Sequence, residues 1–538
     1  MNKTLYNVVL IVLTGLLIAG CANRGTPDGG PKDELPPEII RVEPENFSIN
    51  FNSAEIKIHF NEYIKLKNLQ KQLIISPPMK TQPEITPLGG ASKEITIKIF
   101  DTLKANTTYA FNFGNSIVDN NEGNPYPYYR YVFSTGSHID SLTVTGQIID
   151  ALKRKPETFV NVGLYEVDST FNDSIIYKEA PKYITNTLDS VTTFSIENIK
   201  AGKYMLVALK DGNEDYKFQQ KTDQIGFYNT FITVPTDSSY TLKLFSEDLD
   251  FRASRPYFVT DGKIGFGYEG SNKSMKISLK SGTPANFSHR ITKDEKTDTL
   301  YYWYRPKLDA DSLIFNISNN DYSKDYTVRL RKGDRDSMNI KQIAPKALTE
   351  PFLMTSIVPL VNFDTTKVRI VNKDTVKIAF HSKLDSFNNT YALNFKREQD
   401  NNYNIQILPE AFEDFFGNKS KDTLNYSVVT KKESDYGYIR FVLNNAQYPL
   451  IMQLTNDKGE VKYEQYASKK ETSIDFYNLD SGRYFVRVIH DANGNGQYDT
   501  GHYLKKIQPE RVSHFEMGAD DEVRPDWGLQ QTLNFISE

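Results

Sequence analysis

The residues best placed to do chemistry lie in one short loop near the end of the chain. The segment reads Asp-Ala-Asn-Gly-Asn-Gly-Gln-Tyr-Asp, with oxygen-bearing side chains at Asp491, Asn493, Asn495 and Asp499. Calcium takes roughly six to eight oxygen ligands, and glycines allow a loop to bring alternate side chains to one point. With the carbonyl oxygen of Gln497 as a further ligand, the spacing predicts a calcium site. The same residue types also favour a hydrogen-bonded hairpin turn, which remains the alternative.

The loop resembles the calcium loops of surface-adhesin repeats. It departs from an EF-hand at the twelfth position, where His502 stands in place of a bidentate glutamate. Two carboxylates alone imply modest affinity, in the extracellular range of about 10⁻⁴ to 10⁻³ M. We therefore expect calcium as a possible ligand and no cofactor that the fold requires.

A second reactive residue is Cys21, the one cysteine of the chain. It follows a positively charged start, an apolar run from Val8 to Leu17 and small residues, which is typical of a secretory signal peptide. This pattern resembles a bacterial lipoprotein signal, which implies cleavage before Cys21 and acylation of its sulfur and its new amino group. Acyl chains hold a protein at a bilayer because each buried methylene contributes about 0.8 kcal/mol. An uncleaved anchor helix is the alternative.

Other catalytic or binding patterns are weak. The 7 histidines are scattered, and neither a His-Glu-x-x-His nor a Gly-x-Ser-x-Gly motif occurs. The sequence therefore predicts no enzyme. A net charge of −4 gives no support for nucleic-acid binding. The aromatic runs at 126–131 and 301–304 have the chemistry to stack on sugars or on a partner protein, although alternating strand aromatics more often divide between core and surface.

The composition and patterning predict an all-β protein. The chain has 538 residues, with 33 tyrosines and 32 phenylalanines against 2 tryptophans, and aromatic residues favour strands. Alternation of polar and apolar residues, as in Ala54–Phe60 and Glu94–Phe100, indicates half-buried strands. No helical pattern of useful length occurs. We expect tandem β-sandwich modules after the lipoprotein signal peptide.

Two kinds of module resemble known families, and each resemblance rests on a few local patterns. Pro36-Pro37, the strand ending in Phe-Asn-Glu and the turn Asp119–Asn124 resemble the S-layer type of bacterial Ig-like domain. The stretch from Val144 to Asp215, with its Ala-Gly turn before a long strand, resembles transthyretin-like or Cna-B-like sandwiches. The predicted boundaries are 1–20 for the signal peptide, 21–37 for the lipidated cysteine and tether, 38–137 for the Ig-like domain and 138–250 for the transthyretin-like sandwich.

The second half of the chain repeats both patterns. Thr472–Leu479, Ser481-Gly482 and Arg483–Ile489 parallel Thr193–Leu209 in order, with an Asp-x-Asn loop after each. The strand Tyr403–Ile407 followed by Asp414–Asn418 echoes the end of the first module. We therefore predict a β-sandwich of unrecognised family at 251–344, a second Ig-like domain at 345–432 and a second transthyretin-like sandwich at 433–538.

The whole chain resembles outer-membrane lipoproteins of Bacteroidota, which implies a location and a role. We expect an outer-membrane protein held in the lipid bilayer through Cys21, with an envelope partner such as an outer-membrane barrel. The role would be that of a scaffold or protein-binding module, such as an accessory subunit of an assembly or secretion complex. The alternative is a surface glycan-binding or adhesin-like lipoprotein. No compact acidic run follows Cys21, since Asp28 and Asp33 are dispersed, so the periplasmic face is slightly favoured.

Overall fold

The computed structural model of the chain describes residues 33–188, 191–343, 350–518 and 521–536. Within these ranges nearly all regular structure is strand, which confirms the all-β prediction. The α-helix described there, α2 (Leu69–Gln72), is a single turn. Across the same ranges, no helix is long and apolar enough to cross a membrane. The predicted signal peptide and Cys21 lie outside the described residues.

The first β-sandwich, module 1, packs a sheet of order β1-β2-β5-β4, with β7 paired to β2, against a sheet of order β3-β6-β8. In β2, Ile56, Ile58 and Phe60 are buried and alternate with more exposed residues, as a period of two requires. They share one core with Phe111 and Tyr131 from the facing sheet. The strands are β1 (Ile39–Glu43), β2 (Glu55–Leu66), β3 (Ile74–Ser76), β4 (Glu84–Thr86), β5 (Ser92–Lys98), β6 (Thr108–Asn112), β7 (Ile117–Asp119) and β8 (Arg130–Ser134).

Module 2 packs a sheet of order β11-β10-β13-β14, with β15 paired to β13, against the three-stranded sheet β12-β9-β16. Strands β9 and β16 run parallel, which places the two ends of the module side by side. Leu164, Ile196 and Leu206 are fully or almost fully buried between the sheets. The elements are β9 (Leu142–Asp150), β10 (Asn161–Glu166), η1 (Asp173–Tyr177), β11 (Tyr183–Asn186), β12 (Thr193–Ile199), β13 (Gly202–Lys210), β14 (Gln224–Phe227), β15 (Ile232–Val234) and β16 (Ser239–Leu244).

Module 3 is a third sandwich, with sheets of order β17-β19-β22-β21 and β20-β23-β24, and β18 paired to β19. Its core contains Phe266, Tyr302 and Phe315. The strands are β17 (Arg252–Ala253), β18 (Tyr257–Thr260), β19 (Lys263–Glu269), β20 (Lys276–Leu279), β21 (Ser288–Lys293), β22 (Thr299–Arg305), β23 (Ser312–Asn319) and β24 (Tyr322–Arg329).

Module 4 has the topology of module 1. Its sheets have the orders β25-β26-β30-β29 and β28-β31-β33, and β27, which continues β26, pairs with β32 as β2 pairs with β7. Buried Asp414 at the end of β32 accepts hydrogen bonds from the main-chain N–H groups of Phe416 and Asn418. Asp119 does the same at the end of β7. The elements are β25 (Ile340–Ile343), β26 (Phe352–Ser356), β27 (Leu360–Phe363), η2 (Thr365–Lys367), β28 (Val368–Val371), β29 (Phe380–Asp385), β30 (Thr390–Phe395), β31 (Asn401–Ile407), β32 (Phe412–Asp414) and β33 (Leu424–Thr430).

Module 5 has the topology of module 2. Its sheets have the orders β36-β35-β38-β39 and β37-β34-β40, and β34 runs parallel to β40 as β9 runs parallel to β16. The repeat read from the sequence is therefore also a repeat of strand order. The elements are η3 (Glu433–Asp435), β34 (Gly437–Asn444), β35 (Leu450–Thr455), β36 (Val461–Ala467), β37 (Ser473–Leu479), β38 (Phe485–His490), β39 (Val512–Phe515) and β40 (Gly528–Asn534).

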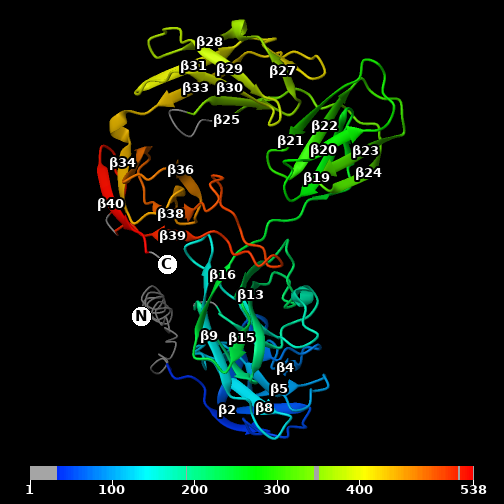
Figure 1. The fold of residues 1–538 in the computed structure, drawn as a ribbon, viewed down its shortest axis with the longest axis vertical. Helices are drawn as coiled ribbons and strands as arrows, with labels where there is room; N and C mark the ends of the chain where they lie inside the picture. The colour runs from blue at the N-terminus through cyan, green and yellow to red at the C-terminus, as the bar shows by residue number, and fades with distance from the viewer. Residues whose placement is uncertain (1–32, 189–190, 344–349, 519–520, 537–538) are drawn as a thin grey trace, which may run out of the picture.

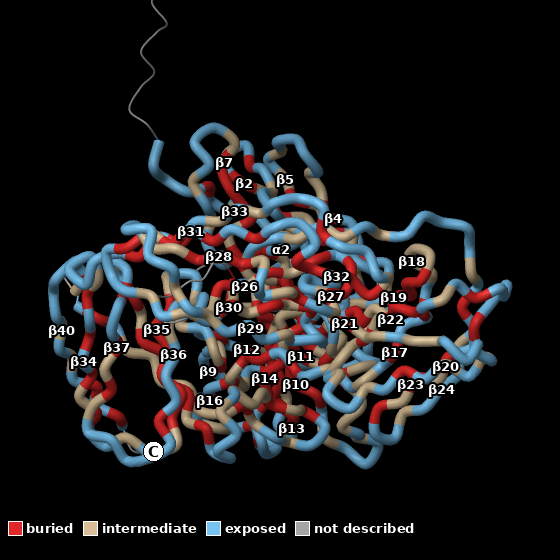
Figure 2. The backbone as a smooth tube through the Cα atoms, turned by 90° about the horizontal axis from the view of Figure 1, so that it is seen from above, coloured by how far each residue is buried: buried red, intermediate tan, exposed pale blue. Residues whose placement is uncertain are grey.

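The five modules do not form a straight row. Figure 1 shows modules 2, 3, 4 and 5 arranged around a common centre, with module 1 extending from module 2. The chain runs from module 2 through module 3 (green) and module 4 (yellow) to module 5 (orange and red), which lies next to module 2 again. Seen from above in Figure 2, β34 and β40 of module 5 lie at the side opposite to β20 and β24 of module 3.

The aromatic run at 301–304 serves the core and a module junction. Tyr302 and Tyr304 point into module 3, and each is 1% exposed. Trp303 lies on the other face of β22 and is also 1% exposed, because Val358 and Phe415 of module 4 pack on it. Stacking on sugars by the run at 301–304 is therefore wrong for Trp303 and Tyr304, because protein covers both rings.

Candidate functional site

The predicted calcium loop leaves β38 and turns around the carboxylate of Asp491, which is 1% exposed. Its Oδ1 accepts a hydrogen bond from the N–H of Asn495 at 3.1 Å, and its Oδ2 accepts one from the N–H of Gly496 at 2.8 Å. Gly494 and Gly496 both have positive φ, 71° and 74°, the region where a glycine costs least. The loop is therefore built as a tight turn around one buried acceptor.

The two asparagines direct their amide groups toward the last residue of the motif. The Nδ2 atoms of Asn493 and Asn495 both donate to Oδ2 of Asp499, the latter at 2.8 Å. The Oδ1 atom of Asn495 accepts from the N–H of Gln497 at 2.7 Å. This is the hydrogen-bonded turn that the sequence leaves as the alternative. Calcium binding requires both amides to rotate so that oxygen faces the ion.

A third carboxylate, which sequence reasoning missed, closes this loop. Glu510 accepts hydrogen bonds from the N–H groups of Ala492 at 2.8 Å and Asp499 at 3.0 Å. Burial raises the pKa of Glu510, and the carboxylates of Asp499 and Asp491 add to the effect. The carboxylates of Asp491, Asp499 and Glu510 thus lie at the loop. A divalent cation bound there would neutralise part of their negative charge.

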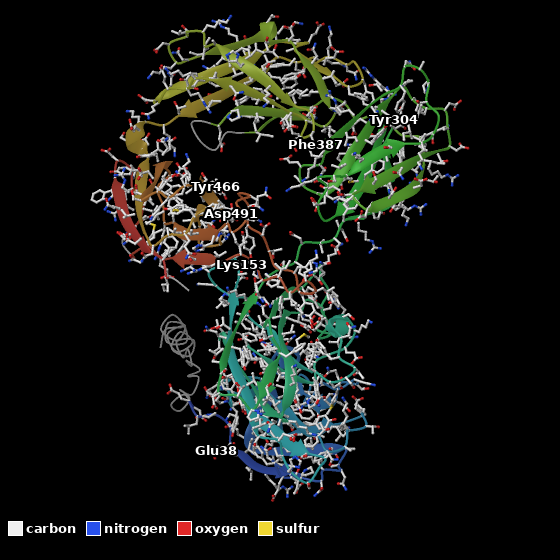
Figure 3. All side chains as sticks on the ribbon, viewed as in Figure 1. Glu38, Lys153, Tyr304, Phe387, Tyr466 and Asp491 are labelled. Carbon is white, nitrogen blue, oxygen red and sulfur yellow. The ribbon has the colours of Figure 1, made fainter. Side chains whose placement is uncertain are left out.

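In the part of the chain that the structure describes, acidic, thiol and imidazole groups alone do not form a metal centre. Among the described residues, no group of three or more His, Cys, Asp or Glu side chains is placed to hold a metal ion. The predicted ligand set depends instead on two asparagines and a main-chain carbonyl, so the calcium site stays a prediction. Figure 3 shows Asp491 near Tyr466, whose hydroxyl contacts the carbonyl oxygen of Gly494 at 3.4 Å.

The segment after the loop, residues 500–511, crosses from module 5 to module 2; we call it the strap. Its Tyr503 is 0% exposed and packs in a cluster formed by Tyr165, Met205, Phe227 and other side chains of module 2. The hydroxyl of Tyr503 lies 3.0 Å from the carbonyl oxygen of Asp173, which accepts its hydrogen bond. The side chain of one module is thus part of the core of another.

Polar contacts hold both sides of the strap. Lys506 forms an ion pair with Asp173 at 2.7 Å, and Gln508 Nε2 donates to the carbonyl oxygen of Phe227 at 3.0 Å. The N–H of Tyr503 donates to the buried carboxylate of Glu247. Gly501 lies against module 2 so closely that an added Cβ would be 2.5 Å from the ring of Phe245. A side chain at position 501 is therefore incompatible with this contact.

A second patch joins the same two modules beside the strap. Arg154 of module 2 forms an ion pair with Glu516 at 2.5 Å and lies 4.2 Å from the centre of the Phe485 ring. Arg487 donates to the carbonyl oxygen of Leu152 at 3.3 Å. Burial, together with the charges of Arg487 and Arg154, lowers the pKa of nearby His514 to about 4. Figure 3 labels Lys153 at this patch, where module 2 meets module 5.

Comparisons with known families cover parts of the chain. The family described as Bacterial Ig-like domain matches residues 33–135. The Ig-like prediction for module 1 is confirmed. The family described as an uncharacterized protein conserved in bacteria (DUF2141) matches residues 428–505, which span most of module 5 and end within the strap. No curated protein matches the chain.

Similar solved structures are distant. The crystal structure of the S-layer protein rSbsC has 10% identity and a TM-score of 0.17, and the match covers 90% of this chain and 67% of that one. The I-band fragment I67-I69 from titin has 14% identity and a TM-score of 0.12, over 53% of this chain and 98% of that one. The BSP domain of a biofilm-associated protein has 8% identity and a TM-score of 0.13, over 87% and 95%. Scores this low carry no functional argument.

Proposed function

We propose that this chain is a non-enzymatic lipoprotein of the outer membrane that acts as a scaffold for other envelope proteins. In its sharper form, it is an accessory subunit of an outer-membrane assembly or secretion complex and binds a β-barrel protein. The observation that carries the proposal is the strap, because it turns a row of sandwiches into one body of fixed shape.

A fixed arrangement of the modules lowers the entropic cost of binding a partner. Sandwich modules joined only by short linkers move relative to one another by default. A partner that touches two such modules must then immobilise them, which costs free energy on binding. The buried Tyr503 and the Lys506–Asp173 ion pair already hold modules 2 and 5 together, so this free energy is spent when the chain folds and not when a partner binds. A partner that binds to two of modules 2 to 5 therefore does not have to immobilise them.

The anchor supports the same role. Acylation of Cys21 would hold the chain at the bilayer, and the Gly- and Pro-rich segment after it would act as a flexible tether. A scaffold tethered in this way meets barrel proteins at a high local concentration. The dispersed acidic residues after Cys21 favour the periplasmic face over the cell surface.

Purification of the tagged full chain from its own envelope in mild detergent tests the proposal. We expect a β-barrel protein at a stoichiometric ratio in mass spectrometry. The Tyr503→Ala variant should retain less of it, and the Cys21→Ala variant should appear in the soluble fraction without it. If wild-type chain brings down no protein above the level seen with Cys21→Ala, the scaffold role is wrong.

A further inference from the structure

The outer face of the sheet β37-β34-β40 in module 5 carries two tyrosines side by side. Tyr438 on β34 is 47% exposed and Tyr477 on β37 is 59% exposed. Their ring centroids lie 6.0 Å apart at an interplanar angle of 28°, an offset stack. Tyr438 also lies flat across β40, since a Cβ added to Gly528 would be 2.2 Å from its ring. The two rings form a broad aromatic surface in contact with solvent.

A pair of charges lies next to the rings on the same face. Arg440 follows Tyr438 by two residues, so the strand directs both side chains to one side. Its Nε and Nη2 atoms donate to Oδ1 and Oδ2 of Asp475 at 2.7 and 2.8 Å. The hydroxyl of Tyr477 also donates to Oδ2 of Asp475, at 3.1 Å. Because the two charges neutralise each other, the face is strongly polar but has no net charge.

Uncharged hydrogen-bonding groups continue along the face beyond this pair. Successive rows on one face are two residues apart, so four rows extend over about 20 Å at roughly 3.3 Å per residue. The residues that follow are Gln530, Ser473, Thr532, Asn444 and Asn534. Half-buried Val442 is the one aliphatic side chain among the described residues of these rows. The centre of a protein interface is typically depleted in charged residues, whereas this face has an arginine–aspartate ion pair among its rows.

Module 2 shows that the sheet does not need the tyrosines to fold. Its corresponding sheet, β12-β9-β16, has the same strand directions and the same pairing register. Thr145 and Ser195 face each other there, as Arg440 and Asp475 do in module 5. Glu197 takes the place of Tyr477 and forms an ion pair with Arg130 of module 1. The aromatic residues thus belong to module 5 alone, on a surface that the described parts of the chain leave exposed.

We propose that this aromatic face (Tyr438, Arg440, Asp475 and Tyr477) binds a neutral polysaccharide chain. The carbon-bound hydrogens of a sugar ring pack against aromatic rings, and its hydroxyl groups both donate and accept hydrogen bonds. A paired arginine and aspartate offer donors and acceptors side by side, which suits such hydroxyls. A charged polymer gains no attraction from a face without net charge. This binding function is independent of the proposed scaffold role.

Affinity electrophoresis of the full chain in mild detergent tests the inference. The gels contain dextran, laminarin or mannan as neutral polymers, and alginate or chitosan as charged ones. The variants are Tyr477→Ser, Arg440→Gln and the double variant Tyr438→Ser/Tyr477→Ser. The matched control is Tyr257→Ser in module 3, because Tyr257 is 49% exposed and also lies across a glycine, Gly265. Melting temperatures report whether each variant keeps its fold.

We expect at least one neutral polymer to retard the wild-type chain. The dissociation constant should rise about tenfold in Tyr477→Ser and in Arg440→Gln, and should not change in Tyr257→Ser. If the double variant has a lower melting temperature than wild type, the single variant Tyr477→Ser decides the matter on its own. The inference is wrong if none of the three neutral polymers retards the chain, if only alginate or chitosan does, or if every variant is retarded like wild type.

Discussion

Tyr503 of module 5 donates a hydrogen bond to the carbonyl oxygen of Asp173 in module 2, 330 positions away in the sequence. The contact is buried and joins the last described module to the second. Together with the patch around Arg154 and Glu516, it holds module 5 against module 2. The strength of this interface therefore decides whether modules 2 to 5 form one body or a flexible row.

The first prediction concerns this contact. Replacing Tyr503 by Ala removes a fully buried aromatic side chain, a change that costs about 3–5 kcal/mol in a protein core. We expect the strap to detach while each module stays folded, so that small-angle X-ray scattering gives a larger radius of gyration. Gly501→Val should have the same effect, because a side chain there collides with Phe245. Unchanged scattering from both variants would show that the strap does not hold the modules together.

The second prediction concerns calcium at the Asp491 loop. If the loop binds calcium with a dissociation constant near 10⁻³ M, about 10 mM calcium should stabilise module 5 by about 1.4 kcal/mol. Thermal unfolding of the full chain with calcium and with a chelator measures the difference. Asp499→Asn should abolish it, and Asp457→Asn, in another loop of module 5, should not. A melting temperature that does not depend on calcium would show that the loop is a hydrogen-bonded turn and not a calcium site.

The third prediction concerns acid. The pKa of His514 is lowered from 6.5 to about 4 in the folded chain, so its neutral form is favoured there. As pH falls from about 6.5 towards 4, the separated modules take up a proton that the folded chain excludes, and stability is lost. Above about pH 6.5 this histidine is neutral in both states, so its titration does not change the stability. His514→Gln should therefore weaken the fall in melting temperature between pH 7 and pH 4.

Carboxylates of the chain also take up protons between pH 7 and pH 4, so the test is the difference in melting temperature between variant and wild type at each pH. The control is His381→Gln, which changes an exposed histidine of module 4. It should follow the wild-type pH profile. Identical profiles for His514→Gln and wild type would contradict the assignment of the acid effect to the module 2–module 5 interface.

The fourth prediction uses the two tryptophans of the chain. Trp303 is 1% exposed and donates a hydrogen bond from Nε1 to Thr292 Oγ1 at 2.9 Å, whereas Trp527 is 56% exposed. Trp303→Ala should destabilise modules 3 and 4 by about 3–5 kcal/mol in urea unfolding. Trp527→Ala should change stability by less than about 0.5 kcal/mol. Equal effects of the two substitutions would contradict the junction described for Trp303.

Local patterns were sufficient to predict the strands and the repeats. Ile56, Ile58 and Phe60 alternate as a half-buried strand must, and the structure buries all three. The order of strand, turn and Asp-x-Asn loop also predicts that module 5 is a copy of module 2, and the two modules share their strand order. The alternation of side chains along β22 gives the wrong prediction at Trp303. It predicts that one face of the strand is exposed, but module 4 covers that face.

The strap and Glu510 could not be predicted in this way. Residues 500–511 include only β-bridge pairing and no apolar period, so nothing in them indicates a buried partner. Tyr503 becomes a core residue through contacts with a module more than two hundred positions earlier. Glu510, near the end of the strap, likewise contacts the Asp491 loop. Contacts of this kind depend on how whole modules pack, which local sequence does not encode.

The place of the strap in the chain also matters during synthesis. Modules fold in order from the amino terminus as a chain is made, and uncovered apolar surface invites aggregation. Met205, Phe227 and Phe245 of module 2 pack with Tyr503, which is made 298 positions after Met205. A chain in which the strap has not yet been made therefore exposes an apolar surface of module 2 that the strap covers in the folded protein. Module 2 therefore has a complete apolar core only once the strap has been made.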